Sequence, residues 1–339
     1  MIGRRILTAV VLVMITATTV LGSSFDSGRV FAQQRSQVGS GNALKVAPVR
    51  NDFTLDPGTT KTFEVIITNL TSVSARLHPA VNDFIASGDE TGTPSIILDE
   101  DKYAPSHSLK QFVSPLQDFT LKAGEERNIK VTINIPQDAA GGGYYGAVRF
   151  SPAAATGSAD KNVNLAASVG SLVLLKVNGE ITENAVIKSF DVRKKDKPGS
   201  FFMNNKDLRG VVRFQNDGNV QVEPFGTVTL KRFGKKVNTV QVNDNSDGQR
   251  GSVLPESIRR FDIPLTNLSS FGKYTLEGNF GYGSTGQLLT AKTTFYVIPL
   301  FIILLCIALF FVIVFLVFGL PRMIRAYNRR IIRKASRRR

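Results

Sequence analysis

The sequence NIKVTINIP at residues 128–136 alternates strictly between polar and apolar side chains. An apolar residue occupies every second position, and Asn, Lys or Thr stands between them. A period of two places one face of a β-strand on a core and the other in water. The sequence TFEVIIT at residues 62–68 follows the same rule with one added isoleucine. Because no comparable amphipathic helix occurs between residues 44 and 296, we predict an all-β region there.

The second half of this region repeats the plan of the first. The run VRFQNDGNVQVEP at residues 212–224 parallels the run over residues 63–79, with a strand, an Asn-containing turn and a second strand ending in proline. Turn residues such as Asn, Gly and Pro separate the strands in both halves. We therefore predict two tandem immunoglobulin-like β-sandwiches, at residues 43–178 and 179–296.

A glycine shortly before a tyrosine marks a strand entry in each half. The two sites are Gly143-Tyr144-Tyr145 and Gly272-Lys273-Tyr274. A tyrosine at such a position is typical of the tyrosine corner of immunoglobulin-like sandwiches. The pairing supports two sandwiches of related design.

An apolar segment follows the second predicted sandwich. Residues 297–320 carry no charge, and residues 321–339 carry nine Lys or Arg and no acid. A bilayer core requires about 20 apolar residues in a helix. We predict one transmembrane helix at residues 297–320. Because cytoplasmic flanks are rich in Lys and Arg, the basic tail should be cytoplasmic and the sandwiches extracellular.

The N-terminal residues have the features of a secretory signal. Arg4 and Arg5 precede an apolar run, and cleavage after Ala32 would satisfy the small-residue rule. Cleavage after Gly22 and an uncleaved anchor are the alternatives. Residues 1–32 are thus a predicted signal peptide, and the polar residues 33–42 a flexible stalk.

The net charge of +15 does not indicate a nucleic-acid partner. The tail holds nine of these charges and the first 32 residues a net two, which leaves +4 for residues 33–320. Positive charge confined to a membrane flank favours contact with anionic lipid headgroups. The absence of cysteine from the predicted ectodomain is typical of bacterial surface proteins without disulfides.

No residue pattern indicates catalysis, a cofactor or a metal site. His78 and His107 have no second ligand at useful spacing, and we expect both in loops; Cys306 lies in the predicted span. The glycine motif GYGSTG at residues 281–286 lacks a following helix and should be a hairpin turn. The sequence NDNSDG at residues 243–248 lacks the carboxylate that would complete a calcium loop. We predict that the protein is not an enzyme.

Binding is the remaining possibility, and the strand after Gly143 offers candidates. Alternation sends Tyr144 to one face and Tyr145 with Arg149 to the other. An exposed tyrosine beside an arginine could stack on a sugar or bind a partner. Tyr145 and Arg149 are therefore candidate ligand-binding residues, although a core tyrosine and an ordinary surface pair would give the same pattern.

Several motifs together resemble a known family. They are Asp-Pro-Gly at residues 56–58, Ser-Leu at 108–109, Gly-Glu at 124–125 before the strand ending in Pro136, and GYYGAVRF at 143–150. This part resembles the first domain of the WxL-interacting proteins of Gram-positive surfaces. The resemblance implies a peptidoglycan-binding sandwich, a host-binding sandwich, a membrane span and a basic tail.

These observations favour a non-catalytic, membrane-anchored envelope protein that binds peptidoglycan or another surface protein. The alternative is a membrane-tethered assembly factor that adds a strand to an exported client. Dependence of binding on wall glycan would favour the first. A stoichiometric complex with one secreted protein would fit the second, or a protein-binding form of the first.

Overall fold

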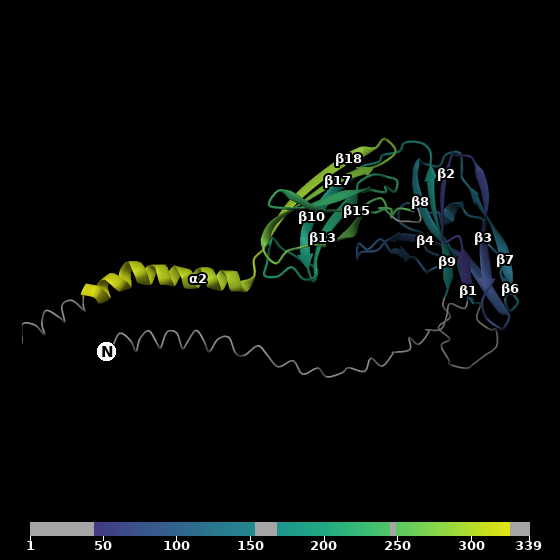
Figure 1. The fold of residues 1–339 in the computed structure, drawn as a ribbon. Coiled ribbons are helices and arrows are strands. Elements are labelled where there is room, and N and C mark those ends of the chain that lie inside the picture. The colour runs from purple at the N-terminus through teal and green to yellow at the C-terminus, as the bar shows by residue number, and fades with distance from the viewer. Residues whose placement is uncertain (1–43, 153–167, 245–248, 326–339) are drawn as a thin grey trace, which may run out of the picture. The chain divides into compact units, whose positions relative to one another are not determined.

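The computed structural model describes residues 44–152, 168–244 and 249–325. The predicted signal peptide and stalk, and the tail after Arg325, lie outside the described residues. So do residues 245–248 of the NDNSDG sequence. Figure 1 shows the described strands and the C-terminal helix.

The strands up to Val177 form two facing sheets, here called the first sandwich. One sheet is antiparallel, in the order β1 (Leu44–Ala47), β3 (Thr60–Asn69) and β7 (Glu126–Asn134). The other has the order β2 (Arg50–Leu55), β9 (Val169–Val177), β8 (Gly142–Pro152), β4 (Ala75–Ala86) and β5 (Pro94–Ile96), with β6 (Phe119–Leu121) also on β4. A short 3-10 turn, η1 (Lys110–Phe112), precedes β6.

The strands from Ala185 to Val297 form the second sandwich. Its smaller sheet has the order β11 (Lys197–Pro198), β10 (Ala185–Lys194), β13 (Leu208–Asn216) and β16 (Ser257–Pro264). Its larger sheet has the order β12 (Phe201–Phe202), β18 (Gln287–Val297), β17 (Gly272–Tyr282), β14 (Phe225–Arg232) and β15 (Lys235–Val242). The all-β prediction is confirmed, while an immunoglobulin-like classification of the sandwiches stays a prediction.

Each sandwich has its own hydrophobic core between its sheets. Ile133 of β7 has no exposed surface and packs in one cluster with Phe150 and Leu175 of the facing sheet. In the second core, the rings of Phe214 and Phe280 from opposite sheets meet edge-on at 5.0 Å. Burying one such side chain contributes about 2 kcal/mol to folding. The alternating residues therefore face the cores, as their period predicts.

A buried asparagine repeats in the two sandwiches. Asn69 ends β3 and donates to the carbonyl oxygens of Val73 and Lys122. Asn216 ends β13 and donates to those of Val220 and Val253. Both asparagines are fully buried. The matching positions confirm that the sequence repeat is also a structural one.

The predicted tyrosine corners are both present. The Tyr144 hydroxyl donates to the Ala140 carbonyl at 2.9 Å. The Tyr274 hydroxyl donates to the Ser269 carbonyl at 3.1 Å and accepts from the Ser269 amide at 2.7 Å. Each bond fixes a strand entry to the loop before it, as in tyrosine corners generally.

The glycine motif near the C-terminus is a hairpin turn, as predicted. It joins β17 to β18, and Gly283 and Gly286 adopt positive φ angles of 72° and 70°. Within this turn and its two strands, the structure places no helix for a dinucleotide-binding motif.

The C-terminal helix begins later than residue 297. Val297 is the last residue of β18, pairs with Gly272 and is fully buried in the second core. Pro299, which lacks an amide hydrogen, is the N-cap of α2 (Leu300–Val314). A π-helical turn, η2 (Phe315–Gly319), follows, and the helical segment runs on to Arg325. This strongly apolar segment of 26 residues is long enough to cross a bilayer.

Candidate functional site

The expected exposure of Tyr145 is wrong. The β8 alternation holds, since Tyr144 packs on the first core and Tyr145 faces the other side of the sheet. There Tyr145 joins Phe84, Ala147 and Leu174 in a small cluster that Leu254 of the second sandwich covers. Only 2% of Tyr145 is exposed. Burial raises the pKa of its hydroxyl, and the side chain cannot stack on a ligand in this structure.

Arg149 lies on the same face as Tyr145, and its guanidinium is already paired. Nε donates to Asn82 Oδ1 at 2.9 Å, and Nη2 donates to Glu100 Oε1 at 3.2 Å. Asn82 is itself buried and donates to the Ile97 carbonyl at 2.9 Å. Arg149 therefore holds the segment that follows β5 against β4 and β8.

A histidine extends this charged cluster. His78 lies on strand β4, not in a loop as expected. Its Nδ1 is 2.6 Å from Asp118 Oδ1, and its Nε2 is 3.3 Å from Glu100 Oε2. Hydrogen bonding to Asp118, and then to Glu100, raises the pKa of His78. The same contact with His78 is the main cause of the lowered pKa of Asp118.

The loop over residues 97–110 is held by a buried carboxylate. Asp83 of β4 has no exposed surface, and it accepts hydrogen bonds from the amides of Ala104 and Lys110, both at 2.9 Å. Hydrogen bonds to a charged group are about twice as strong as neutral ones. Asp83 thus fixes both the middle and the end of the loop.

This loop presents the exposed tyrosine that the sequence analysis assigned to Tyr145. Tyr103 is 57% exposed, and Lys110 Nζ lies 4.7 Å from the centre of its ring. Lys110 also donates to the carbonyl of Glu100, whose carboxylate binds Arg149. The loop surface, defined by His78, Glu100, Tyr103, Lys110 and Arg149, therefore combines an aromatic ring with both signs of charge. Such a combination can stack on a sugar and pair with charged groups.

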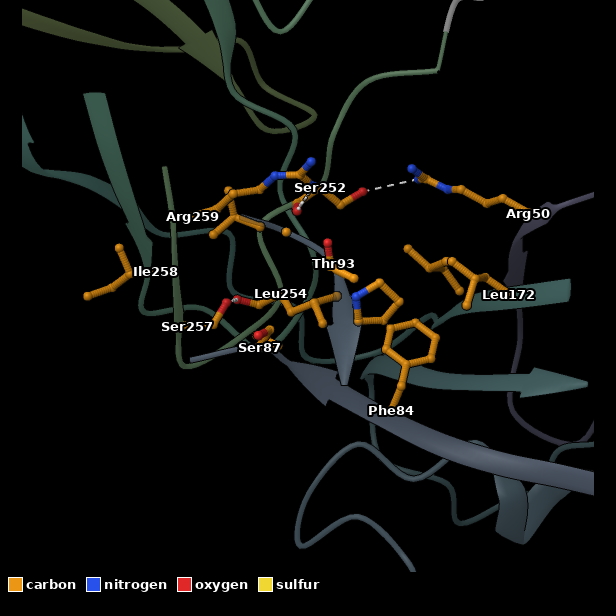
Figure 2. Close-up of a pocket in the computed structure, with 15 residues that line it drawn as sticks. Arg50, Phe84, Ser87, Thr93, Leu172, Ser252, Leu254, Ser257, Ile258 and Arg259 are labelled. Carbon is orange, nitrogen blue, oxygen red and sulfur yellow. Dashed lines mark hydrogen bonds between the residues drawn. The ribbon is translucent and has the colours of Figure 1, made fainter. Parts of the chain in front are cut away.

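A second candidate lies where the two sandwiches meet. A cavity of about 80 Å³ lies there. Figure 2 shows Phe84, Leu172 and Leu254 among the side chains that line it. Ser252 lies between two arginines: its hydroxyl accepts from Arg50 at 3.1 Å, and its carbonyl accepts from Arg259 at 2.8 Å. This small cavity is mainly a packing feature of the contact.

A larger and more open cavity of about 470 Å³ adjoins Arg50. Arg50 Nη2 lies 2.7 Å from both Asp52 Oδ1 and Glu223 Oε1. Burial acts to lower the pKa of Arg50, but these two carboxylates outweigh it and the pKa is raised. Arg250 lies 3.7 Å from the Phe225 ring centre. Arg50 is thus paired with carboxylates and Arg250 lies over an aromatic ring, so the cavity offers polar and cationic contacts.

No sequence pattern indicated these contacts. Arg50 and Glu223 are 173 positions apart, and Arg149 and Glu100 are 49 apart. Tyr103 is an aromatic residue within a charged stretch of sequence. Its exposure is the one feature of the loop surface that the sequence could have indicated. Among the described residues, no group of His, Cys, Asp or Glu could hold a metal ion.

The fold and the loop surface define a two-sandwich β-protein with a C-terminal apolar helix. Residues 51–152 match the family described as "WxL Interacting Protein, peptidoglycan binding domain". The predicted relationship to the WxL-interacting proteins is thereby confirmed over this part of the chain. The match covers every residue of the loop surface.

Other comparisons give weaker similarity. The class 5 fimbriae chaperone CfaA is 14% identical, with 76% of this chain and 100% of that chain covered and a TM-score of 0.36. The E. coli chaperone DraB is 12% identical, with 75% and 96% covered and a TM-score of 0.32. At these scores neither carries an argument about function. No curated protein matches the chain.

Proposed function

We propose that this protein is a non-catalytic, membrane-anchored component of a bacterial cell envelope that binds peptidoglycan through its first sandwich. The family match of residues 51–152 is the observation that supports this proposal. α2 is the anchor, the sandwiches are extracellular, and the basic residues 321–339 are cytoplasmic and contact anionic lipid. A secreted surface protein is the other partner that this arrangement could serve.

The loop surface is the proposed contact with the wall. Peptidoglycan carries N-acetylated sugars and peptide carboxylates and amines. The exposed Tyr103 ring can stack on a sugar face. Its neighbour Lys102 pairs with Asp99 at 3.1 Å, and because this pair is exposed and weak, Lys102 can exchange Asp99 for a carboxylate of the wall peptide. Arg149 and Glu100 act from beneath by fixing the loop. The second sandwich, residues 179–296, then holds this surface away from the membrane.

Co-sedimentation of the detergent-solubilised full chain with purified peptidoglycan sacculi tests the proposal. Tyr103→Ala should weaken binding at least several-fold, because the stacking ring is lost. Leu288→Ala, at an exposed apolar residue of the second sandwich, is the matched control and should bind like the unmodified chain. Digested sacculi added in solution should compete.

Two results would contradict the proposal. Equal binding of the Tyr103→Ala chain would remove the loop surface from the contact. No binding to sacculi, together with a stoichiometric complex with one secreted protein, would favour the assembly-factor alternative.

A further inference from the structure

The two ends of the second sandwich carry opposite charge. At one end lie the ends of β14 and β18 and the start of β17, since Arg232 pairs with Tyr274 and Gly272 pairs with Val297. The described loops and strand ends there, at residues 194–197, 203–209, 232–236 and 265–273, carry nine Lys or Arg and two Asp. The opposite described loops, at residues 178–184, 217–224, 243–244, 249–256 and 283–286, carry six acids and one Arg.

The basic end also exposes large apolar side chains. Phe201 is 72% exposed and stacks on Tyr296 with ring centres 4.9 Å apart. Phe233 is 59% exposed, and its ring centre lies 6.3 Å from that of Phe271. The Phe233 amide donates a hydrogen bond to the Lys273 carbonyl, and Lys273 of β17 pairs with Tyr296 of β18. The apolar end is defined here by Phe201, Met203, Phe233 and Phe271, which are all exposed and lie at the same end of the sandwich.

Phe233 occupies a backbone position that is unusual for an aromatic residue. Phe233 and Gly234 form the two-residue turn between β14 and β15, with φ angles of 47° and 83°. Asn or Asp normally precedes glycine in such turns, because positive φ is costly for a bulky residue. The chain therefore holds an aromatic ring at a hairpin tip in a strained conformation, without burying it in the protein.

The apolar end lies close to the start of the membrane helix. Val297 ends β18, and α2 begins at Leu300. Three residues span at most about 10 Å. The interfacial region of a bilayer leaflet is about 5–7 Å thick. Because Gly272 pairs with Val297, the residues of the apolar end lie within reach of the headgroups of the leaflet that α2 enters.

We propose that the apolar end of the second sandwich docks on the outer leaflet of the membrane that holds α2. Phe201, Phe233 and Phe271 enter the boundary between headgroups and acyl chains, where apolar side chains of membrane-bound surfaces are buried. The surrounding Lys and Arg contact anionic phospholipids. The acidic opposite end is repelled by the same lipids. The second sandwich therefore has one orientation on the membrane, with its acidic end directed away from the lipid.

The chain contains no tryptophan, so single replacements report on their own positions. The full chain carrying Phe233→Trp or Phe201→Trp is reconstituted in phosphatidylcholine vesicles with added phosphatidylglycerol, with and without brominated acyl chains. Both tryptophans should be quenched at least twofold by the brominated lipid and should emit at shorter wavelength. The matched control is Leu288→Trp, whose native residue is 82% exposed. It lies nine strand residues from Val297, about 30 Å away, and should not be quenched.

A charge-reversal variant tests the lipid contact. Lys235→Glu with Lys236→Glu, both exposed beside the Phe233 turn, is combined with Phe233→Trp. The two replacements should reduce the quenching of the introduced tryptophan in vesicles that contain phosphatidylglycerol, because they remove the attraction between the basic end and anionic lipid.

Two results would contradict the docking. If Phe233→Trp and Phe201→Trp are quenched no more than Leu288→Trp, the sandwich does not dock and the proposal is overturned. Equal quenching with and without phosphatidylglycerol would overturn the contact with anionic lipid. Binding to sacculi is not measured, so these outcomes are independent of the proposed wall binding.

Discussion

The hydroxyl of Tyr145, on the first sandwich, donates a hydrogen bond of 2.8 Å to Oε1 of Gln221 on the second. Next to it, the Gly143 amide donates to the Asn219 carbonyl at 2.8 Å. Glu90 of the first sandwich also forms a salt bridge with Arg213 of the second. The contact between the sandwiches thus combines a buried aromatic residue with backbone and ionic contacts, and it couples their stabilities.

Tyr145→Phe should lower the free energy of unfolding by about 1 kcal/mol, because one hydrogen bond is lost. Tyr145→Ala should lower it by about 3–5 kcal/mol, since a cavity replaces a buried ring. Denaturant unfolding of the full chain in detergent measures both. Tyr103→Phe, at an exposed tyrosine, is the control and should change nothing. An unaltered midpoint for Tyr145→Ala would show that Tyr145 is not buried in solution.

Asp83→Asn should release the loop over residues 97–110. The replacement keeps the shape but removes the charge that binds the amides of Ala104 and Lys110, and a cost of about 2–3 kcal/mol follows. Amide hydrogen exchange in the loop should accelerate, and binding to sacculi should weaken with it. Asp101→Asn, at an exposed site in the same loop, should alter neither. Unchanged exchange at Ala104 would show that Asp83 does not hold the loop.

His78 should make stability depend on pH. Asp118 and Glu100 raise its folded pKa above the ordinary value of 6.5. The stabilisation that protonated His78 contributes is therefore complete below about pH 6.5, and it is lost as the pH rises through the folded pKa. His78→Gln should lower the melting temperature more at about pH 5.5 than at about pH 9. The same decrease at both pH values would contradict the ion pair.

Asn216→Asp should be strongly destabilising. The new carboxylate oxygen would face the carbonyl oxygens of Val220 and Val253, to which the amide now donates. A buried, unpaired charge costs about 3–5 kcal/mol. Asn69→Asp should behave alike because it occupies the repeated position, whereas exposed Asn279→Asp should be neutral. Thermal unfolding compares the three variants. A small change in melting temperature for Asn216→Asp would show that the buried asparagine does not stabilise the fold.

The orientation of the chain can be tested on cells stripped of wall. Added protease should digest the sandwiches and spare a tag placed after Arg339, because the proposed topology places the tail in the cytoplasm. Permeabilised cells are the control, in which the tag should also be lost. Loss of the tag in intact cells with the sandwiches preserved would reverse the proposed topology.

The sequence by itself determined the local features. A period of two fixes which side chains of a strand share a face, so residues 62–68 and 128–136 identified core positions without any structure. An uncharged apolar segment of this length predicts a helix able to cross a bilayer, and the structure has such a helix, although it begins at Leu300 and not at residue 297. Pairing of Val297 with Gly272 extended β18, and Pro299 set the boundary.

Only the tertiary structure decided what covers each outer face. Alternation correctly placed Tyr145 and Arg149 together, but it could not show that Leu254 and Gln221 bury the tyrosine or that Glu100 pairs with the arginine. These partners come from distant parts of the chain. Periodicity reports the direction of a side chain relative to its own strand, and it contains no information about which distant segment packs there.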